Sequence, residues 1–113
     1  MLEVDTNYNI SLTRGDTGIF SISLKDANGD PYTPVEGDVL RFAMAKKYKE
    51  LYSGENVLVL KQIPIETCIL ELEPEDTELL EYGSYVYDIE FTDTDGHVST
   101  IISSKLKLTK EVE

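Results

Sequence analysis

Acidic side chains gather in one stretch of the chain, at a spacing that could serve acid-base catalysis. The stretch contains Glu71, Glu73, Glu75, Asp76, Glu78 and Glu81. Two carboxyl groups can hydrolyse a glycosidic bond when a cleft raises the pKa of one of them and aromatic side chains stack on the sugar. Here Glu71 and Glu73 alternate with Leu70 and Leu72, so they share the outward face of a predicted strand. We therefore interpret the stretch as a solvated surface rather than as a hydrolase active site.

The other groups that often carry out chemistry are isolated in this sequence. His97 has no second imidazole and no reactive cysteine beside it, which leaves neither a catalytic dyad nor a usual zinc site. Cys68 is the one cysteine, so an internal disulfide is excluded, and its alternation with Leu70 and Leu72 predicts a core position. No Gly-rich phosphate loop or Gly-x-Ser-x-Gly elbow occurs. The sequence therefore predicts no enzyme and no cofactor.

Two short motifs are similar to known binding sequences. The first looks like the start of a calcium-binding loop, with oxygen donors at Asp26, Asn28 and Asp30. Such a loop needs a glycine after its third ligand and a glutamate at its end, where this chain has Pro31 and Gly37. The second is Arg14-Gly15-Asp16, an integrin-recognition tripeptide whose glycine and aspartate are also common in turns between strands. We predict a turn there, and no metal site.

The charge and length of the chain limit its partners and its size class. The 113 residues carry a formal net charge of -12, from 10 basic and 22 acidic side chains. This length fits one domain over 1–113 with a single core. The negative charge repels phosphate backbones and anionic lipid surfaces, so we expect no nucleic-acid or membrane partner. The first residues lack a basic stretch followed by an apolar run, and no apolar run reaches about 18 residues. We expect the protein to be made in the cytoplasm.

Apolar residues alternate with polar ones along most of the chain, which is the pattern of strands with one buried face. Strands are predicted at 8–12, 20–24, 39–45, 57–63, 67–73 and, as two long segments, within 83–109. Pro74 and the acidic residues after it predict a helical turn over 74–80, which Gly83 ends. The expected fold is an all-β, two-sheet antiparallel sandwich of about seven strands, with this helical turn before the penultimate strand.

The last two predicted strands form a long hairpin with Asp95-Gly96 at its tip. Asp-Gly favours a two-residue turn, in which both central residues need positive φ. In that register Phe91 pairs with Thr100 and Ile89 with Ile102, whereas a four-residue loop shifts the pairs by two and keeps the same faces inward. In either register the inward side chains of the last strand are those of Val98, Thr100, Ile102, Leu106 and Leu108.

Two features resemble immunoglobulin-like domains. Pro74-Glu75-Asp76-Thr77 is followed by Gly83-Ser84-Tyr85-Val86-Tyr87, which is similar to the corner before the penultimate strand of such domains. The resemblance implies that Tyr85 closes this corner through a hydrogen bond to upstream backbone. Tyr87 stands where antibody-type domains have their second cysteine, and the sequence has no tryptophan. The resemblance therefore implies a disulfide-free relative of the antibody domains.

The front half of the chain carries a more telling resemblance. Its motifs are, in order, Thr13-Arg14-Gly15-Asp16-Thr17, the run from Ile22 to Tyr32, and Gly37-Asp38-Val39-Leu40-Arg41-Phe42. This order is similar to that of small immunoglobulin-like domains encoded among tail and baseplate genes of phages and prophages of Gram-positive bacteria, such as the N-terminal domain of baseplate upper proteins. The resemblance implies a virion structural protein that docks to other tail or baseplate proteins, or to itself in a symmetric assembly.

A single basic cluster interrupts the acidic surface of the chain. Its candidate contacts with a partner are Lys46, Lys47, Tyr48, Lys49, Leu51 and Tyr52. Tyrosine beside positive charge is common at protein interfaces, and the cluster could meet the acidic run of a neighbouring copy. The alternative is an ordinary insertion between strands, whose apolar residues fold back on the sheet. The sequence leaves both interpretations open.

A second function fits the same predicted fold. This function is a carbohydrate- or protein-binding module at a bacterial surface. The sequence has no tryptophan, the usual platform for stacking on sugars, and no export signal at its start. We therefore rank this function below docking within a virion.

Overall fold

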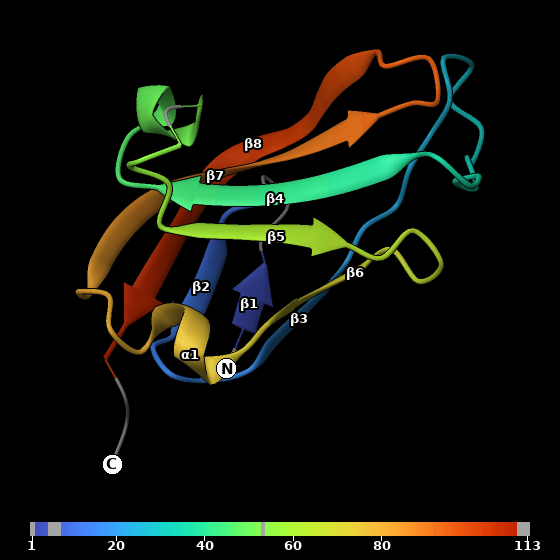
Figure 1. Ribbon diagram of the computed structural model, residues 1–113. Helices are drawn as coiled ribbons and strands as arrows, with labels where there is room; N and C mark the ends of the chain where they lie inside the picture. The colour runs from blue at the N-terminus through green and yellow to red at the C-terminus, as the bar shows by residue number, and fades with distance from the viewer. Residues whose placement is uncertain (1, 5–7, 53, 111–113) are drawn as a thin grey trace.

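The computed structural model describes residues 2–4, 8–52 and 54–110, which form eight strands in two facing sheets (Figure 1). The larger sheet contains, in spatial order, β1 (Leu2–Val4), β2 (Ile10–Thr13), β8 (Val98–Thr109), β7 (Gly83–Thr92), β4 (Val39–Ala45) and β5 (Val59–Ile63). The smaller sheet pairs β3 (Gly18–Ser21) with β6 (Ile69–Leu72). Two short helices complete the fold, η1 (Tyr48–Tyr52) and α1 (Pro74–Thr77).

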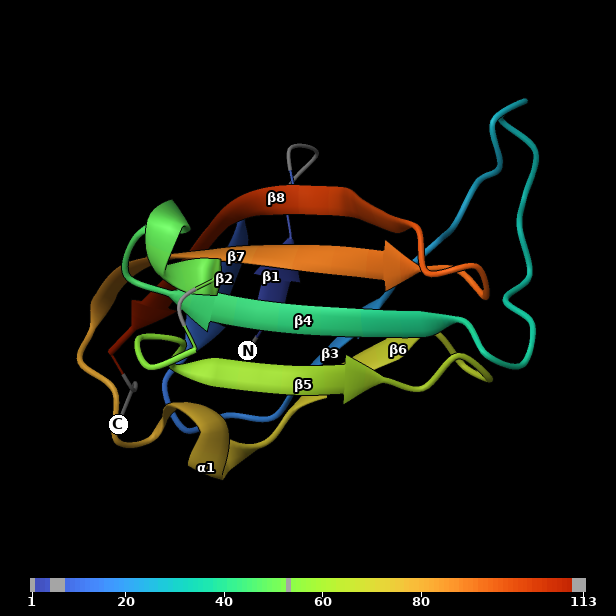
Figure 2. The ribbon, with the colours of Figure 1, turned by 45° about the horizontal axis from the view of Figure 1, so that its top comes forward.

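The predicted all-β sandwich is confirmed. β3 and β6 pair antiparallel in one layer, which lies behind the layer that contains β4, β7 and β8 in Figure 2. Two packed sheets form a β-sandwich, and here the strands divide six and two between the sheets. The structure adds a short first strand, β1, and one parallel pair, β2 with β8, to an otherwise antiparallel fold. Among the described residues, no helix is long and apolar enough to cross a membrane.

The core lies between the two sheets and is rich in large side chains. The largest fully buried ones are Tyr85, Tyr87, Phe42, Ile10, Leu12, Leu40, Met44, Ile63, Leu70, Leu72, Ile89 and Leu106. Phe42 and Tyr87 pack together with their ring centroids 5.5 Å apart. The Tyr87 hydroxyl donates a hydrogen bond to the Tyr8 carbonyl oxygen, so this buried polar group has a partner.

The tip of the β7–β8 hairpin differs from both predicted registers. Its loop has three residues, because the Asp93 N–H donates to the His97 carbonyl oxygen (3.0 Å) and closes the turn there. Gly96 adopts a φ of 86°, which the bulge at the end of a three-residue loop requires. Phe91 consequently pairs with Ser99, one position away from the predicted partner.

A bulge in β8 corrects this shift further from the tip. The bulge lies between the pair of Ile89 with Ile102 and the next pair, Glu90 with Thr100. Ile101 is the extra residue on β8. The predicted pairing of Ile89 with Ile102 is therefore present. Between the bulge and the tip, however, the faces of the strand are exchanged, because a slip of one residue turns each side chain to the other side. The prediction that Val98 and Thr100 point inward is wrong, and both are exposed.

The strands of the smaller sheet are shorter than predicted. β3 ends at Ser21, although Ile22 stays buried and its N–H donates to the Cys68 carbonyl oxygen (2.9 Å). Cys68 has a φ of 53° and donates its own N–H to the Pro64 carbonyl oxygen (2.8 Å), which closes a turn where the strand was expected to begin. The turn leaves Cys68 half-buried at the margin of the core rather than within it, and this burial raises the pKa of its thiol.

Tyr85 lies at the corner between α1 and β7. Its side chain is buried, and its hydroxyl donates to the carbonyl oxygen of Glu81 (2.5 Å), four residues upstream. A bond of this kind is what the immunoglobulin resemblance implies for Tyr85. The ammonium group of Lys46 lies 4.5 Å from the centroid of the same ring, so the loop after β4 also contacts this corner.

The turn after β2 packs against the same corner. The Gly15 N–H donates to the hydroxyl of Thr77 in α1 (3.0 Å), and Thr77 is buried. Arg14 donates to the Leu80 carbonyl oxygen (3.2 Å), and its guanidinium lies 4.1 Å from the centroid of the Tyr82 ring. The Arg-Gly-Asp tripeptide thus has a structural role, because it joins the start of the fold to the segment before β7.

Candidate partner-docking site

The predicted contact segment 46–52 lies on the outer face of the large sheet, where η1 packs on β4 and β7 (Figure 1). Leu51 is 4% exposed and forms a small second core with Ala43, Ala45 and Val86. The prediction of Leu51 as a partner contact is therefore wrong. This leucine folds back on the sheet because the alanines of β4 leave an apolar surface that only a large side chain from outside can cover.

Asp88 fastens the end of η1 to the sheet. Its side chain is 1% exposed, and its carboxylate accepts hydrogen bonds from Arg41 (3.2 Å) and from the Tyr52 hydroxyl (3.1 Å). Arg41 also forms an ion pair with Glu90 at 2.5 Å. A buried carboxylate destabilises the fold unless it is paired and hydrogen-bonded. Loss of the bonds from Arg41 or Tyr52 would therefore cost free energy. The hydrogen bond to Asp88, with burial and repulsion by the same carboxylate, raises the pKa of Tyr52.

The remaining candidate side chains of this segment are exposed. They are Lys46, Lys47, Tyr48, Lys49 and Tyr52. Tyr52 exposes 66% of its area even though its hydroxyl is bonded to Asp88. These five exposed side chains flank the buried Leu51 in sequence, and Lys46 directs its ammonium group toward the Tyr85 ring. We call this surface the basic surface.

Two exposed leucines that the alternation of residues did not identify lie beside the basic surface. Leu60 pairs with Ala43, the residue that Leu51 covers, and exposes 64% of its area. Leu58 is 41% exposed, and its N–H donates to the Met44 carbonyl oxygen (2.8 Å). The run Val57-Leu58-Val59-Leu60 is apolar on both faces, so alternation alone could not tell which leucines face outward.

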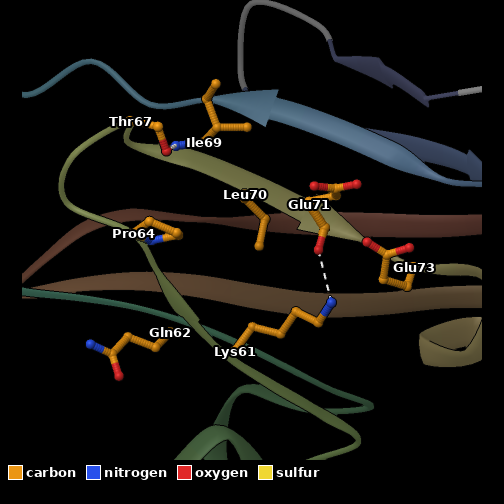
Figure 3. Close-up of a pocket in the computed structure, with 8 residues that line it drawn as sticks. All are labelled: Lys61, Gln62, Pro64, Thr67, Ile69, Leu70, Glu71 and Glu73. Atoms are coloured by element: carbon orange, nitrogen blue, oxygen red, sulfur yellow. Dashed lines mark hydrogen bonds between the residues drawn. The ribbon is translucent and has the colours of Figure 1, made fainter.

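A groove separates the edge of β5 from the edge of β6 (Figure 3). Its volume is about 590 Å³, and its lining residues are Lys61, Gln62, Pro64, Thr67, Ile69, Leu70, Glu71 and Glu73. β5 is the last strand of the large sheet, and β6 is an edge of the small one. Each wall of the groove is therefore the edge of a strand, and within the described part of the chain no strand pairs with either edge on the groove side.

Lys61 reaches across this groove from β5, as Figure 3 shows. Its ammonium group donates to the Glu71 carbonyl oxygen (2.8 Å) and forms an ion pair with Asp76 (2.5 Å). A lysine beside an open strand edge is a common way to prevent unwanted pairing. Lys61 thus links the edge strand of the large sheet, β5, to the edge of the small sheet, β6.

Glu71 and Glu73 form an acidic rim on the β6 side of the groove. A hydrogen bond with Glu71 raises the pKa of Glu73, and repulsion by the Glu71 carboxylate acts in the same direction. Lys61 opposes this shift without cancelling it. The rim therefore places the carboxyl groups of Glu71 and Glu73 near one lysine, which is itself paired with Asp76. Further along the acidic run, Glu75, Glu78 and Glu81 are exposed.

A second cleft opens near the tip of the β7–β8 hairpin. Its volume is about 750 Å³, and its lining residues are Tyr8, Ser23, Leu24, Lys25, Asp26, Tyr32, Phe91, Asp93 and Ile101. The rings of Tyr32 and Phe91 meet edge to face with their centroids 5.7 Å apart. Tyr8 has a φ of 63°, which large side chains rarely adopt. Aromatic rings beside carboxylates are common in ligand-binding clefts.

The hairpin tip also places three possible metal ligands together. One ligand atom each of Asp93, Asp95 and His97 lies within 4.8 Å of the other two, which the sequence analysis did not foresee for His97. The N–H groups of Asp95 and His97 both donate to Asp93 Oδ1 (2.9 Å), and these bonds lower the pKa of Asp93. The carboxylate that begins the 26–30 loop accepts two N–H bonds in the same way. Turn closure accounts for both arrangements.

Comparison with known proteins gives no family assignment. A scan against models of protein families finds no match to this sequence, and a search of curated proteins finds no significant relative. The fold and the surfaces described above are therefore the basis for an inference about function.

Proposed function

We propose that this chain is a non-enzymatic structural protein of a phage or prophage tail, baseplate or virion appendage. It is made in the cytoplasm of the host bacterium and resides in the virion after assembly. It acts by docking to other tail or baseplate proteins, or to copies of itself. The proposal is supported by the resemblance of the motifs at 13–17, 22–32 and 37–42 to domains of such proteins and by the immunoglobulin-like sandwich in which they lie.

The observation that carries the docking role is the fixed position of the basic surface. Leu51 and the hydrogen bond from Tyr52 to Asp88 anchor η1 to the sheet, so the segment that carries the lysines has a fixed position before a partner arrives. A preorganised surface loses less conformational entropy on binding than a flexible loop does. The exposed faces of Tyr52 and Leu60 add apolar area beside the lysines.

Charge would decide which partners the basic surface accepts. An acidic patch on a partner would attract these lysines. The rest of the chain is acidic, with a net charge of -12 overall, so it would repel any other acidic surface of that partner. The acidic coat therefore discourages wrong partners while the basic surface selects the right one. An acidic surface on a neighbouring virion protein or on a second copy fits this requirement.

Co-assembly with the tail and baseplate proteins of the same phage or prophage tests this proposal. We expect the wild-type chain to purify with at least one of them, and the double variant Lys47→Glu/Lys49→Glu to lose that partner. The double variant Lys107→Glu/Lys110→Glu is a matched control, because it makes the same charge change at exposed lysines outside the basic surface. Failure of the wild-type chain to bind any of these proteins would contradict the proposal.

A second candidate function is a carbohydrate- or protein-binding module at a bacterial surface. The cleft near the hairpin tip favours it, since Tyr32 and Phe91 offer aromatic rings and Asp26 and Asp93 offer hydrogen-bond acceptors to sugar hydroxyls. A glycan screen with the wild-type chain and with Phe91→Ala distinguishes the two functions. A saturable glycan hit that Phe91→Ala abolishes would favour the binding module over the virion protein.

A further inference from the structure

We infer that the open edge of β6 binds an extended segment of another protein. The segment would lie in the groove between β6 and β5, add a third strand to the small sheet, and place a basic side chain opposite Glu71. This inference concerns the groove alone and holds whether or not the chain belongs to a virion.

The hydrogen bonds of β6 show which of its backbone groups face the groove. The Cys68 carbonyl oxygen accepts from Ile22, so Cys68 directs its carbonyl toward the β3 side. Backbone groups alternate along a strand, which turns those of Leu70 toward β3 and those of Ile69 and Glu71 toward the groove. The bond from Lys61 to the Glu71 carbonyl oxygen agrees with this direction. Ile69 and Glu71 therefore offer the N–H and C=O groups that a new strand needs.

Side chains cap part of this edge in the free protein. The Thr67 hydroxyl accepts the Ile69 N–H (3.3 Å), and Lys61 donates to the Glu71 carbonyl oxygen (2.8 Å). Both caps come from rotatable side chains, and Lys61 has a second partner in Asp76 (2.5 Å). An incoming strand can therefore replace the two caps with backbone bonds. The small sheet has two strands of four residues, so a third strand would also enlarge a sheet of minimal size.

The chemistry of the rim specifies a basic side chain in the segment. Glu71 pairs with Ile19 of β3 on one side, and no strand of the described residues pairs with it on the groove side. Opposite charges that face each other across two strands stabilise the pair. A cation there would also relieve the repulsion that raises the pKa of Glu73. Ile69 lies two residues from Glu71 on the same face, so the segment should carry an apolar residue two positions from the basic one.

Charge also argues against a second copy as the occupant. Pairing β6 with β6 of another copy would bring the Glu71 and Glu73 carboxylates of both copies together. Each copy also carries a net charge of -12. Like charges that face each other across strands are destabilising, so the edge favours a basic segment of a different protein.

Peptides of defined sequence test this inference. The probe is acetyl-Thr-Thr-Val-Thr-Lys-Thr-Thr-amide, which places an apolar and a basic side chain on one face. A second peptide has Glu in place of Lys, and a third keeps the side chains of the probe but has alternate backbone nitrogens methylated. The readout is the change in the amide NMR signals of Ile69 and Glu71 during titration, up to about 1 mM peptide, because single strands bind weakly.

We expect saturable changes at Ile69 and Glu71 with the Lys peptide, about tenfold weaker binding of the Glu peptide, and no binding of the methylated one. The variant Glu71→Lys should reverse the preference between the first two peptides. Glu78→Lys is the matched control, because Glu78 is an exposed acid that does not line the groove, and it should preserve the preference.

Four results would overturn the inference. They are no saturable change with any peptide, equal binding of the methylated peptide, changes centred on Ile19 or on the basic surface instead of β6, and a concentration-dependent change at Glu71 without peptide. The last result would identify a second copy as the occupant of the groove.

Discussion

The two sheets of this sandwich differ in how completely their strands are paired. In the large sheet, β7 pairs with β8 along its whole length and with β4 along most of it. In the small sheet, β3 and β6 share four residue pairs, and the described chain supplies no further strand to either of them. The comparison indicates that the large sheet has central strands paired on both sides, whereas both strands of the small sheet are edges that remain open to partners.

The outer face of the large sheet is partly covered, whereas apolar surface on the outer face of the small sheet is exposed. η1 covers part of the large sheet, and its Leu51 closes a second small core there. On the small sheet, Ile19 remains 59% exposed.

Opening the core at the large sheet should have the largest effect. Phe42 is fully buried and packs on Tyr87, so Phe42→Ala should lower the free energy of unfolding by about 3–5 kcal/mol. Ile19→Ala on the outer face of the small sheet is the control and should change it by no more than about 0.5 kcal/mol. Chemical denaturation of both variants measures the two values. Similar losses of unfolding free energy in the two variants would contradict the contrast between the packed large sheet and the exposed outer face of the small sheet.

Releasing η1 should have the next largest effect. Asp88→Asn removes the buried charge that Arg41 and Tyr52 share, and it should cost about 1–3 kcal/mol in unfolding free energy. It should also bring the pKa of Tyr52 back toward the usual 10.0, which an NMR titration of the Tyr52 ring signals measures. An unchanged Tyr52 pKa would mean that Asp88 does not hold η1.

Removing the corner hydroxyl should have a smaller effect. Tyr85→Phe keeps the buried ring and deletes the hydrogen bond to the Glu81 carbonyl oxygen, so we expect a loss of about 1 kcal/mol in thermal or chemical unfolding. Tyr82→Phe keeps the contact of that ring with Arg14 and should leave stability unchanged. An equal effect of the two changes would show that the corner bond contributes nothing.

The smallest effect should appear in the response to pH. The pKa of Glu73 in the folded chain lies above its usual value, so its contribution to stability is present at low pH and is lost as the pH rises through the folded pKa. Asp93 behaves in the opposite way, because its lowered pKa gives stability that is lost as the pH falls through the folded value. Glu71→Gln should lower the pKa of Glu73 and leave that of Asp93 unchanged. Carboxyl NMR titrations of both residues decide between these outcomes.

Alternation in the sequence was sufficient to predict the sandwich and most of its core. The predicted strand at 39–45 coincides with β4, and the helical turn begins at Pro74 as expected. The hairpin register was not predictable, because Asp95-Gly96 fits both a two-residue loop and the observed three-residue loop with a bulge. The compensating bulge at Ile101 has no sequence signal of its own.

The candidate site was only partly predictable for a related reason. The composition of 46–52 marked a surface cluster, but whether Leu51 faces a partner or the sheet depends on Ala43 and Ala45 leaving room beneath it. The groove depends on sheet order, since β5 and β6 are consecutive in sequence yet belong to different sheets. Sheet order follows from long-range packing, which alternation does not encode.

Amide hydrogen exchange of the isolated chain tests the central contrast most directly. β7 lies between two strands, so its amides in the paired region should all exchange slowly. In β6 the Leu70 amide faces β3 and should also be slow, whereas the Glu71 amide faces the groove and should exchange much faster. Equal protection of Leu70 and Glu71 would show that the β6 edge is already occupied, and it would contradict the account of an open edge on the small sheet beside large-sheet strands that are paired on both sides.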